Sequence, residues 1–146
     1  MMSTLAFRNL DVSPADPVQS WPTEAVEAAM ERGLLPDWAR IAAEIRGAPW
    51  GRVARTVEAV LRYNRPYGVD VLLERAIAHA RADAAAADRA EVADTIRRAL
   101  RESGLTRREA AYRLGTSTSR LSTYATGRVT PSAAFLVALR RLTDPT

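Results

Sequence analysis

Arginine and hydroxyl side chains are concentrated in one window of the sequence, LTRREAAYRLGTSTSRLSTYATGRVTPS, which runs from Leu105 to Ser132. A guanidinium group can hold a phosphate or a guanine edge through two hydrogen bonds. A hydroxyl is a short group that both donates and accepts, so it can meet either a base edge or a phosphate. The residue types in this window therefore suit contact with a polyanion.

Charge is distributed unequally along the chain. The formal net charge of the 146 residues is +4, and all 21 basic residues are Arg. Residues 1–88 carry 10 Arg against 12 Asp and Glu, a balance of −2, whereas residues 89–146 carry 11 Arg against 5 acids, a balance of +6. A compact basic unit is typical of proteins that bind nucleic acid, although a solvated Arg-rich surface gives the same count.

Two short helices are predicted to carry these side chains. Thr106 begins a capping-box pattern, which predicts a helix over Arg107–Leu114 that stops at Gly115. Ser117 can cap a second helix, which ends at Gly127. Because the connection is so short, the helices cannot be antiparallel and must cross steeply, as in a helix-turn-helix. Ala111 suits the place where the two axes approach closely, and the residues expected to form the apolar seam are Ala110, Leu114, Leu121 and Tyr124.

The N-terminal part is predicted to be a small helical bundle preceded by an extended arm at 1–19. Pro22, Pro36 and Pro49 each open a run of residues with apolar side chains at helical spacing, which predicts three amphipathic helices. Trp21, Trp38 and Trp50 stand beside these starts, and we expect them to pack the three helices together.

The stretch from Val69 to Ser103 contains neither Gly nor Pro and is predicted to be helical. It is either one long helix or two, because Asp88 and Glu91 have capping-box spacing. No run of alternating β-branched residues is present, so the expected fold class is all-α. We place the bundle at 20–87 and the helix-turn-helix domain at 88–146.

Several functions are excluded by what the sequence lacks. No Cys is present, the lone His79 has no metal-ligand neighbours, and no phosphate loop or nucleophile motif occurs, so we expect no metal, no cofactor and no enzyme activity. The absence of a long apolar stretch predicts a cytoplasmic protein without a membrane contact. Arg62–Gly68, RYNRPYG, is either a base-stacking loop or a turn between helices, and the acidic surroundings favour the turn. The Arg-only, Ala-rich composition suggests a bacterial, GC-rich genome.

The window at Leu105–Ser132, followed by AAFLVALRRL, resembles the Cro-like and lambda-repressor-like helix-turn-helix family, also called the XRE family. The resemblance covers about Glu91 to Leu142. It implies a lambda-repressor-like domain whose recognition helix, at about Ser117 to Tyr124, enters the major groove of double-stranded DNA. Carried over by position, it implies base reading by Thr118, Ser119, Arg120, Ser122 and Thr123. It also implies phosphate binding by Thr106, Arg107, Arg108, Ser117, Arg128 and Thr130.

The resemblance and the charge distribution together predict a sequence-specific transcriptional regulator, expected to be a repressor and a homodimer. The helices within 20–87 would then supply a dimer contact. An alternative is an antitoxin-like module, which neutralises a protein partner through 20–87 and represses its own operon. Tyr112 stands where the family often has a long polar side chain, and we expect it to cover the neighbouring domain or to stack on the DNA backbone.

Overall fold

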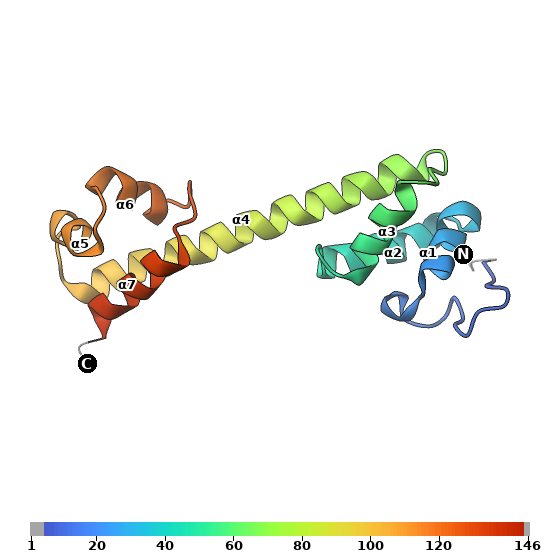
Figure 1. Cartoon of the computed structure of the whole chain (residues 1–146), viewed down its shortest axis with the longest axis horizontal. Helices are drawn as coiled ribbons and strands as arrows, with labels where there is room; N and C mark the ends of the chain where they lie inside the picture. Colours follow the sequence, from blue (N-terminus) through green and yellow to red (C-terminus); the bar gives the residue numbers. More distant parts are fainter. Residues whose placement is uncertain (1–4, 145–146) are drawn as a thin grey trace. The chain divides into compact units, whose positions relative to one another are not determined.

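The computed structural model describes residues 5–144, in which seven α-helices and one short 3₁₀ helix occur without any strand (Figure 1). This confirms the all-α prediction. Contacts divide the chain into two compact units, one up to Ala84 and one from Ala85. The elements are η1 (Val18–Ser20), α1 (Thr23–Arg32), α2 (Leu35–Gly47), α3 (Arg52–Leu61), α4 (Val69–Ser103), α5 (Arg107–Leu114), α6 (Thr118–Ala125) and α7 (Ala133–Thr143).

The first unit is a bundle of α1, α2, α3 and the beginning of α4 around one apolar core. Pro36 lies in the first turn of α2, where the missing amide of proline is harmless. The buried Asp37 accepts a hydrogen bond from the amide of Leu34 at 2.9 Å and so closes the start of the same helix. The largest buried side chains of this core are Trp21, Met30, Ile41, Ile45, Leu73, Val26, Val57 and Val60.

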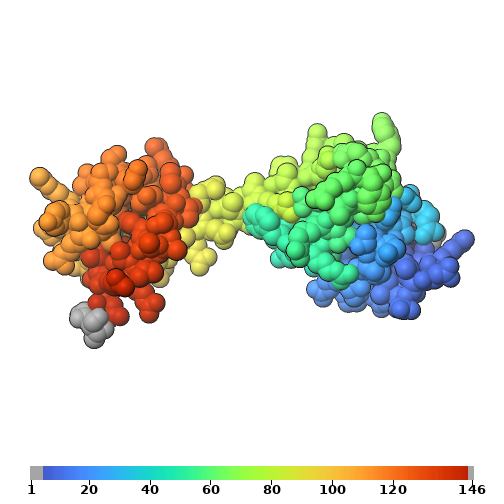
Figure 2. Space-filling model, in the orientation of Figure 1, coloured from blue at the N-terminus to red at the C-terminus, as the bar shows by residue number. Residues whose placement is uncertain are grey.

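The N-terminal arm packs on the bundle and covers part of its surface (dark blue in Figure 2). Phe7 meets the ring of the buried Trp21 edge-on, with ring centroids 5.0 Å apart. Arg40 lies over the same indole at 5.1 Å and donates to the carbonyls of Pro14 and Asp16. A cation from α2 therefore ties the arm to the bundle.

Only part of the tryptophan prediction is confirmed. Trp21 is 1% exposed, and Trp38 packs against the core while its Nε1 donates to the carbonyl of Ala29 at 2.9 Å. The expectation for Trp50 is wrong, because its side chain is 54% exposed. It lies beneath the Arg81 guanidinium, 5.8 Å from the ring centroid, so a cation–π contact takes the place of core packing.

Helix α4 runs without interruption through Asp88, so the second of the two alternatives, a new helix start at this residue, is not observed. Ala has the highest intrinsic helix propensity, and the segment from Ala84 to Ala87 is entirely Ala. The beginning of α4 buries Leu73 and Ile77 in the first unit, and its end buries Ile96 and Leu100 in the second.

The second unit consists of the end of α4 with α5, α6 and α7 around a separate core. This core combines large side chains with small ones where helices approach closely. Its buried members are Ile96, Leu100, Ala110, Ala111, Leu121, Ala125 and Leu139. Over the described residues, no helix is long and apolar enough to span a bilayer.

Candidate nucleic-acid interface

The first helix of the pair, α5, begins and ends where its flanking residues dictate. The hydroxyl of Thr106 accepts a hydrogen bond from the amide of Glu109 at 3.1 Å, as the capping pattern predicts. Gly115 ends the helix in the left-handed conformation, with φ of 70°. The amide of Thr116 then returns to the carbonyl of Ala111 at 3.0 Å, which reverses the chain within one turn.

The second helix, α6, follows immediately. Its cap is Ser117, whose Oγ accepts from the amide of Arg120 at 3.0 Å. After α6, Gly127 has φ of 80°, and the amide of Arg128 bonds back to the carbonyl of Thr123 at 3.1 Å. A Cβ on Gly127 would lie 3.5 Å from the Cβ of Ala93, so the loop passes close to α4.

The two helices pack through small residues and one large anchor. Ala110 and Ala111 of α5 are buried where the axes approach, and Leu121 of α6 fills the space between them and α4. Tyr124 contacts Phe135 of α7 edge-on, with ring centroids 4.9 Å apart. The predicted seam is confirmed, and with a connection of only residues 115–117 the pair has helix-turn-helix geometry.

The exposed face of α6 carries hydroxyl groups. At 100° per residue, Ser119 and Thr123 lie on the side of the helix opposite the buried Leu121. Arg120 lies at the edge of this face, where it lines a small pocket together with Tyr124 and Ser132. Thr118, Ser119, Arg120 and Ser122 are exposed, whereas Thr123 is half-buried.

The hydroxyls differ in what they still offer a ligand. Thr123 donates its proton to the carbonyl of Arg120 at 2.6 Å, so it has only its lone pairs and its methyl group left. Ser117 and Thr106 accept their capping hydrogen bonds, so each keeps its own proton. A capping hydroxyl can therefore donate to a phosphate oxygen without giving up its role at the helix end.

Residues 91–144 match the family model of a helix-turn-helix domain. The match covers the end of α4 and all of α5, α6 and α7, which is the second unit almost in full. Comparison of the chain with curated proteins and with solved structures gives no match. The helix-turn-helix domain indicates a DNA-binding regulator, and α6 is the second helix of its pair.

The helix-turn-helix domain carries several exposed cationic side chains. Within the part of the chain that the structure describes, no ion pair involves Arg107, Arg108, Arg120 or Arg128, and all four are exposed. Thr130 is exposed in the loop after α6. Their contacts with bases or phosphates stay predictions. Arg101 and Arg113 are also exposed arginines, and the sequence reasoning did not assign them to DNA.

One residue that holds α6 in place was missed. Arg97 projects from α4, and its Nη1 donates to the carbonyl of Ala125 at 2.5 Å. This carbonyl belongs to the last turn of α6, where helix carbonyls lack partners within the helix and the helix dipole favours a cation. The two residues lie 28 positions apart, so no local pattern reveals their contact.

The structure also places Tyr112 and the RYNRPYG stretch, two features that the sequence analysis singled out. Tyr112 is 86% exposed on α5 and lies beside Arg108 and Arg113. In the RYNRPYG stretch, Tyr63 donates to Glu27 at 2.8 Å, which raises the pKa of this phenol, and Arg65 pairs with Glu74 at 2.7 Å. This agrees with the favoured interpretation of the stretch as a turn, because Tyr63 and Arg65 both bind acids of the first unit.

Proposed function

We propose that the chain is a sequence-specific DNA-binding transcriptional regulator of the XRE type, with α6 as its recognition helix. The observation that carries the proposal is the exposed hydroxyl face of α6, in a domain whose exposed Arg107, Arg108, Arg120 and Arg128 pair with no acid among the described residues. Ser119 is central on this face, and Arg120 at its edge is the one side chain there that can bind guanine through two hydrogen bonds. The flanking arginines then bind phosphates.

The regulator acts as a repressor and a homodimer in this proposal. A dimer places two copies of α6 in major grooves one helical turn apart, about 34 Å. Occupation of a site by both copies keeps other proteins from the same DNA. Transcription from a promoter that carries the selected site should therefore fall when the protein is expressed.

Selection of bound DNA from a random pool tests the function directly, since it gives both the sequence and the spacing of any half-sites. On the selected site, the affinity should fall with salt by about 0.9 in log K per log salt for each neutralised phosphate. Weak binding that does not depend on salt would contradict the proposal.

The two arginine roles are separable by substitution. We expect Arg120→Ala to lose about 1–3 kcal/mol on the selected site and to relax the preference at one base-pair position. Arg128→Ala should weaken all sequences alike and reduce the salt slope by about 1. Equal losses on selected and random DNA for both variants would contradict this assignment.

A second candidate, a protein-binding role of the first unit, is favoured by one observation. Tyr67 is fully exposed, and Val71 and Leu72 nearby at the start of α4 are also exposed. An antitoxin-like regulator would use such a surface to hold its partner. Co-expression with the products of adjacent genes tests this role. The role would be contradicted if none of these products co-purified with the chain.

A further inference from the structure

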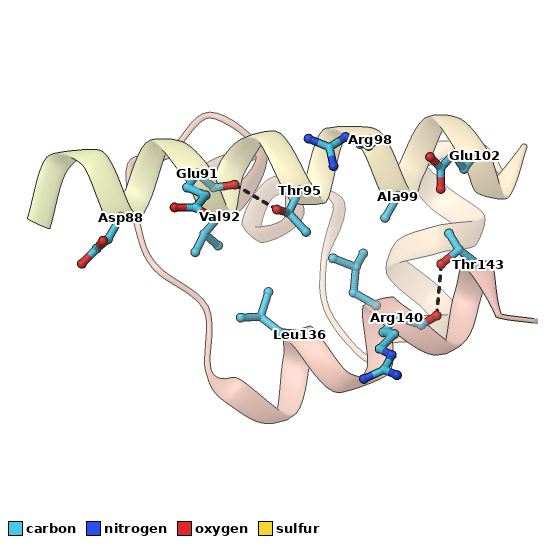
Figure 3. A pocket seen from close by; sticks show the side chains of 11 residues that line it. Asp88, Glu91, Val92, Thr95, Arg98, Ala99, Glu102, Leu136, Arg140 and Thr143 are labelled. Atoms are coloured by element: carbon cyan, nitrogen blue, oxygen red, sulfur yellow. Dashed lines mark hydrogen bonds between the residues drawn. The ribbon is translucent and has the colours of Figure 1, made fainter.

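A groove of about 600 Å³ with both apolar and charged lining residues lies within the second unit, between the end of α4 and α7 (Figure 3). Val92 and Ala99 line it from α4, and Leu136 lines it from α7. Figure 3 shows Val92 and Leu136 directed into the space between the two helices. The buried Leu139 lies at its floor.

The two walls of the groove carry opposite charges. Asp88, Glu91 and Glu102 are exposed on the α4 wall, and Arg140 is exposed on the α7 wall. Arg98 also lines the α4 wall, but it pairs with Asp94 at 2.5 Å. Among the residues described, Arg140 takes part in no ion pair, and neither do the three acids of the α4 wall.

This distribution is self-complementary. A two-fold interface brings the same patch of both copies together, so it requires a patch that matches itself. When a second copy is turned by a half-rotation about an axis along the groove, its basic α7 wall faces the acidic α4 wall of the first copy, and the reverse pairing forms at the same time. A partner with charge of one sign would satisfy only one wall.

The groove is separate from the surface assigned to DNA. None of its lining residues belongs to α5, α6 or the loop that follows α6. A stable interface buries about 800 Å² per partner, so contact must extend beyond the groove. Val137, which is 51% exposed on α7, provides further apolar surface for this extension.

We propose that this groove is the surface through which two copies of the chain associate, with α7 of each copy lying against α4 of the other. The proposal rests on the proposed function, because it supplies the pairing of two recognition helices on one DNA site. It assigns that pairing to the second unit rather than to the helices of the first.

Charge reversal tests the surface. One variant combines Glu91→Arg with Glu102→Arg, and the other carries Arg140→Glu. Each alone places like charges across both halves of the interface, so we expect the dissociation constant of the dimer to rise at least about tenfold, as measured by sedimentation equilibrium. An equimolar mixture should restore dimers, because reversed walls then face each other and native walls face each other.

Matched controls are Asp83→Arg and Arg75→Glu, which reverse exposed charges on α4 outside the groove. Both should dimerise like the unaltered chain. Far-UV circular dichroism confirms that each variant is folded, and rescue in the mixture cannot come from an unfolded protein. Reversed variants that dimerise normally, a mixture that stays monomeric, or an unaltered chain that is monomeric would overturn the proposal.

The outcome for the proposed function is measured separately, on DNA that carries a single half-site. A monomeric variant should still bind this half-site with an unchanged salt slope, because α6 and its flanking arginines are intact. Retained half-site binding together with a failed charge swap overturns only the dimer surface. Loss of half-site binding by the unaltered chain overturns the DNA-binding function instead.

Discussion

Replacement of Arg97 by Ala tests how α6 is held in place. The hydrogen bond from Arg97 to the carbonyl of Ala125 joins a cation to the end of α6. Hydrogen bonds to charged groups contribute about 1.5–3 kcal/mol, and a cation at a helix C-terminus contributes about 0.3–1 kcal/mol. Because the Arg97 side chain is 43% exposed, water replaces part of this, and we expect a loss of about 1 kcal/mol.

A loss of this size should lower the melting temperature of the second unit by about 4–8 °C. All three Trp residues lie in the first unit, so Trp fluorescence follows that unit while far-UV circular dichroism follows both. Arg97→Ala should shift only the transition that fluorescence does not report. Fraying of α6 should also weaken binding to the selected site, by at most about fivefold, since the apparent affinity falls with the fraction of molecules in which α6 is intact.

Arg98→Ala is the matched control, because Arg97 and Arg98 both pair with Asp94, at 3.8 and 2.5 Å, and carry the same charge, and the Arg98 side chain is 59% exposed. It should lose only the value of a helical ion pair, about 0.3–0.5 kcal/mol. Equal shifts for both variants would refute the positioning role of Arg97. A salt slope reduced by about 1 in Arg97→Ala alone would instead identify Arg97 as a phosphate contact.

Two further predictions concern turns and pH. Gly115→Ala should destabilise the second unit by about 1 kcal/mol, because the φ of 70° is unfavourable for any residue with a Cβ. No steric clash adds to this loss, since a Cβ there meets no atom within 4 Å. Gly47→Ala, at the end of α2, should stabilise the first unit by about 0.5–1 kcal/mol, and destabilisation would contradict this. The hydrogen bond from Arg81 lowers the pKa of Glu58 from its ordinary 4.5. The pair therefore stabilises the first unit at pH values above 4.5, and this stabilisation is lost as the pH falls through the lowered pKa. The fall of the urea midpoint on acidification, measured by Trp fluorescence, should be smaller in Glu58→Gln, and equal falls would show that the pair contributes nothing.

Much of the fold follows from local chemistry that the sequence displays. The caps at Thr106 and Ser117 and the left-handed Gly115 are set by neighbouring residues, so helix ends in the second unit match the prediction within a residue. The steep crossing of α5 and α6 follows from the short turn between them. Periodic apolar residues likewise indicate the helices of the first unit.

Long-range contacts escape this reasoning. Arg97 meets Ala125 only after folding, and Trp50 is drawn to Arg81 across 31 positions instead of entering the core. The pattern at Asp88 is that of a cap, but a run of Ala before it favours a continuous helix more strongly. The groove between α4 and α7 also depends on how two distant helices pack, so no local motif predicts it.

The helix caps of the second unit influence which ligand charge is favoured at the N-terminal ends of its helices. Thr106, Ser117 and Ser132 each begin a helix with a neutral hydroxyl. An Asp would cap as well and would interact favourably with the helix dipole, but its charge would cancel the positive end of the helix. At α6 and α7, whose first turns carry no acid, the neutral cap closes the helix and leaves its positive end attractive to an anion. The Ser and Thr caps in this window therefore close their helices and also suit the phosphate contacts proposed above.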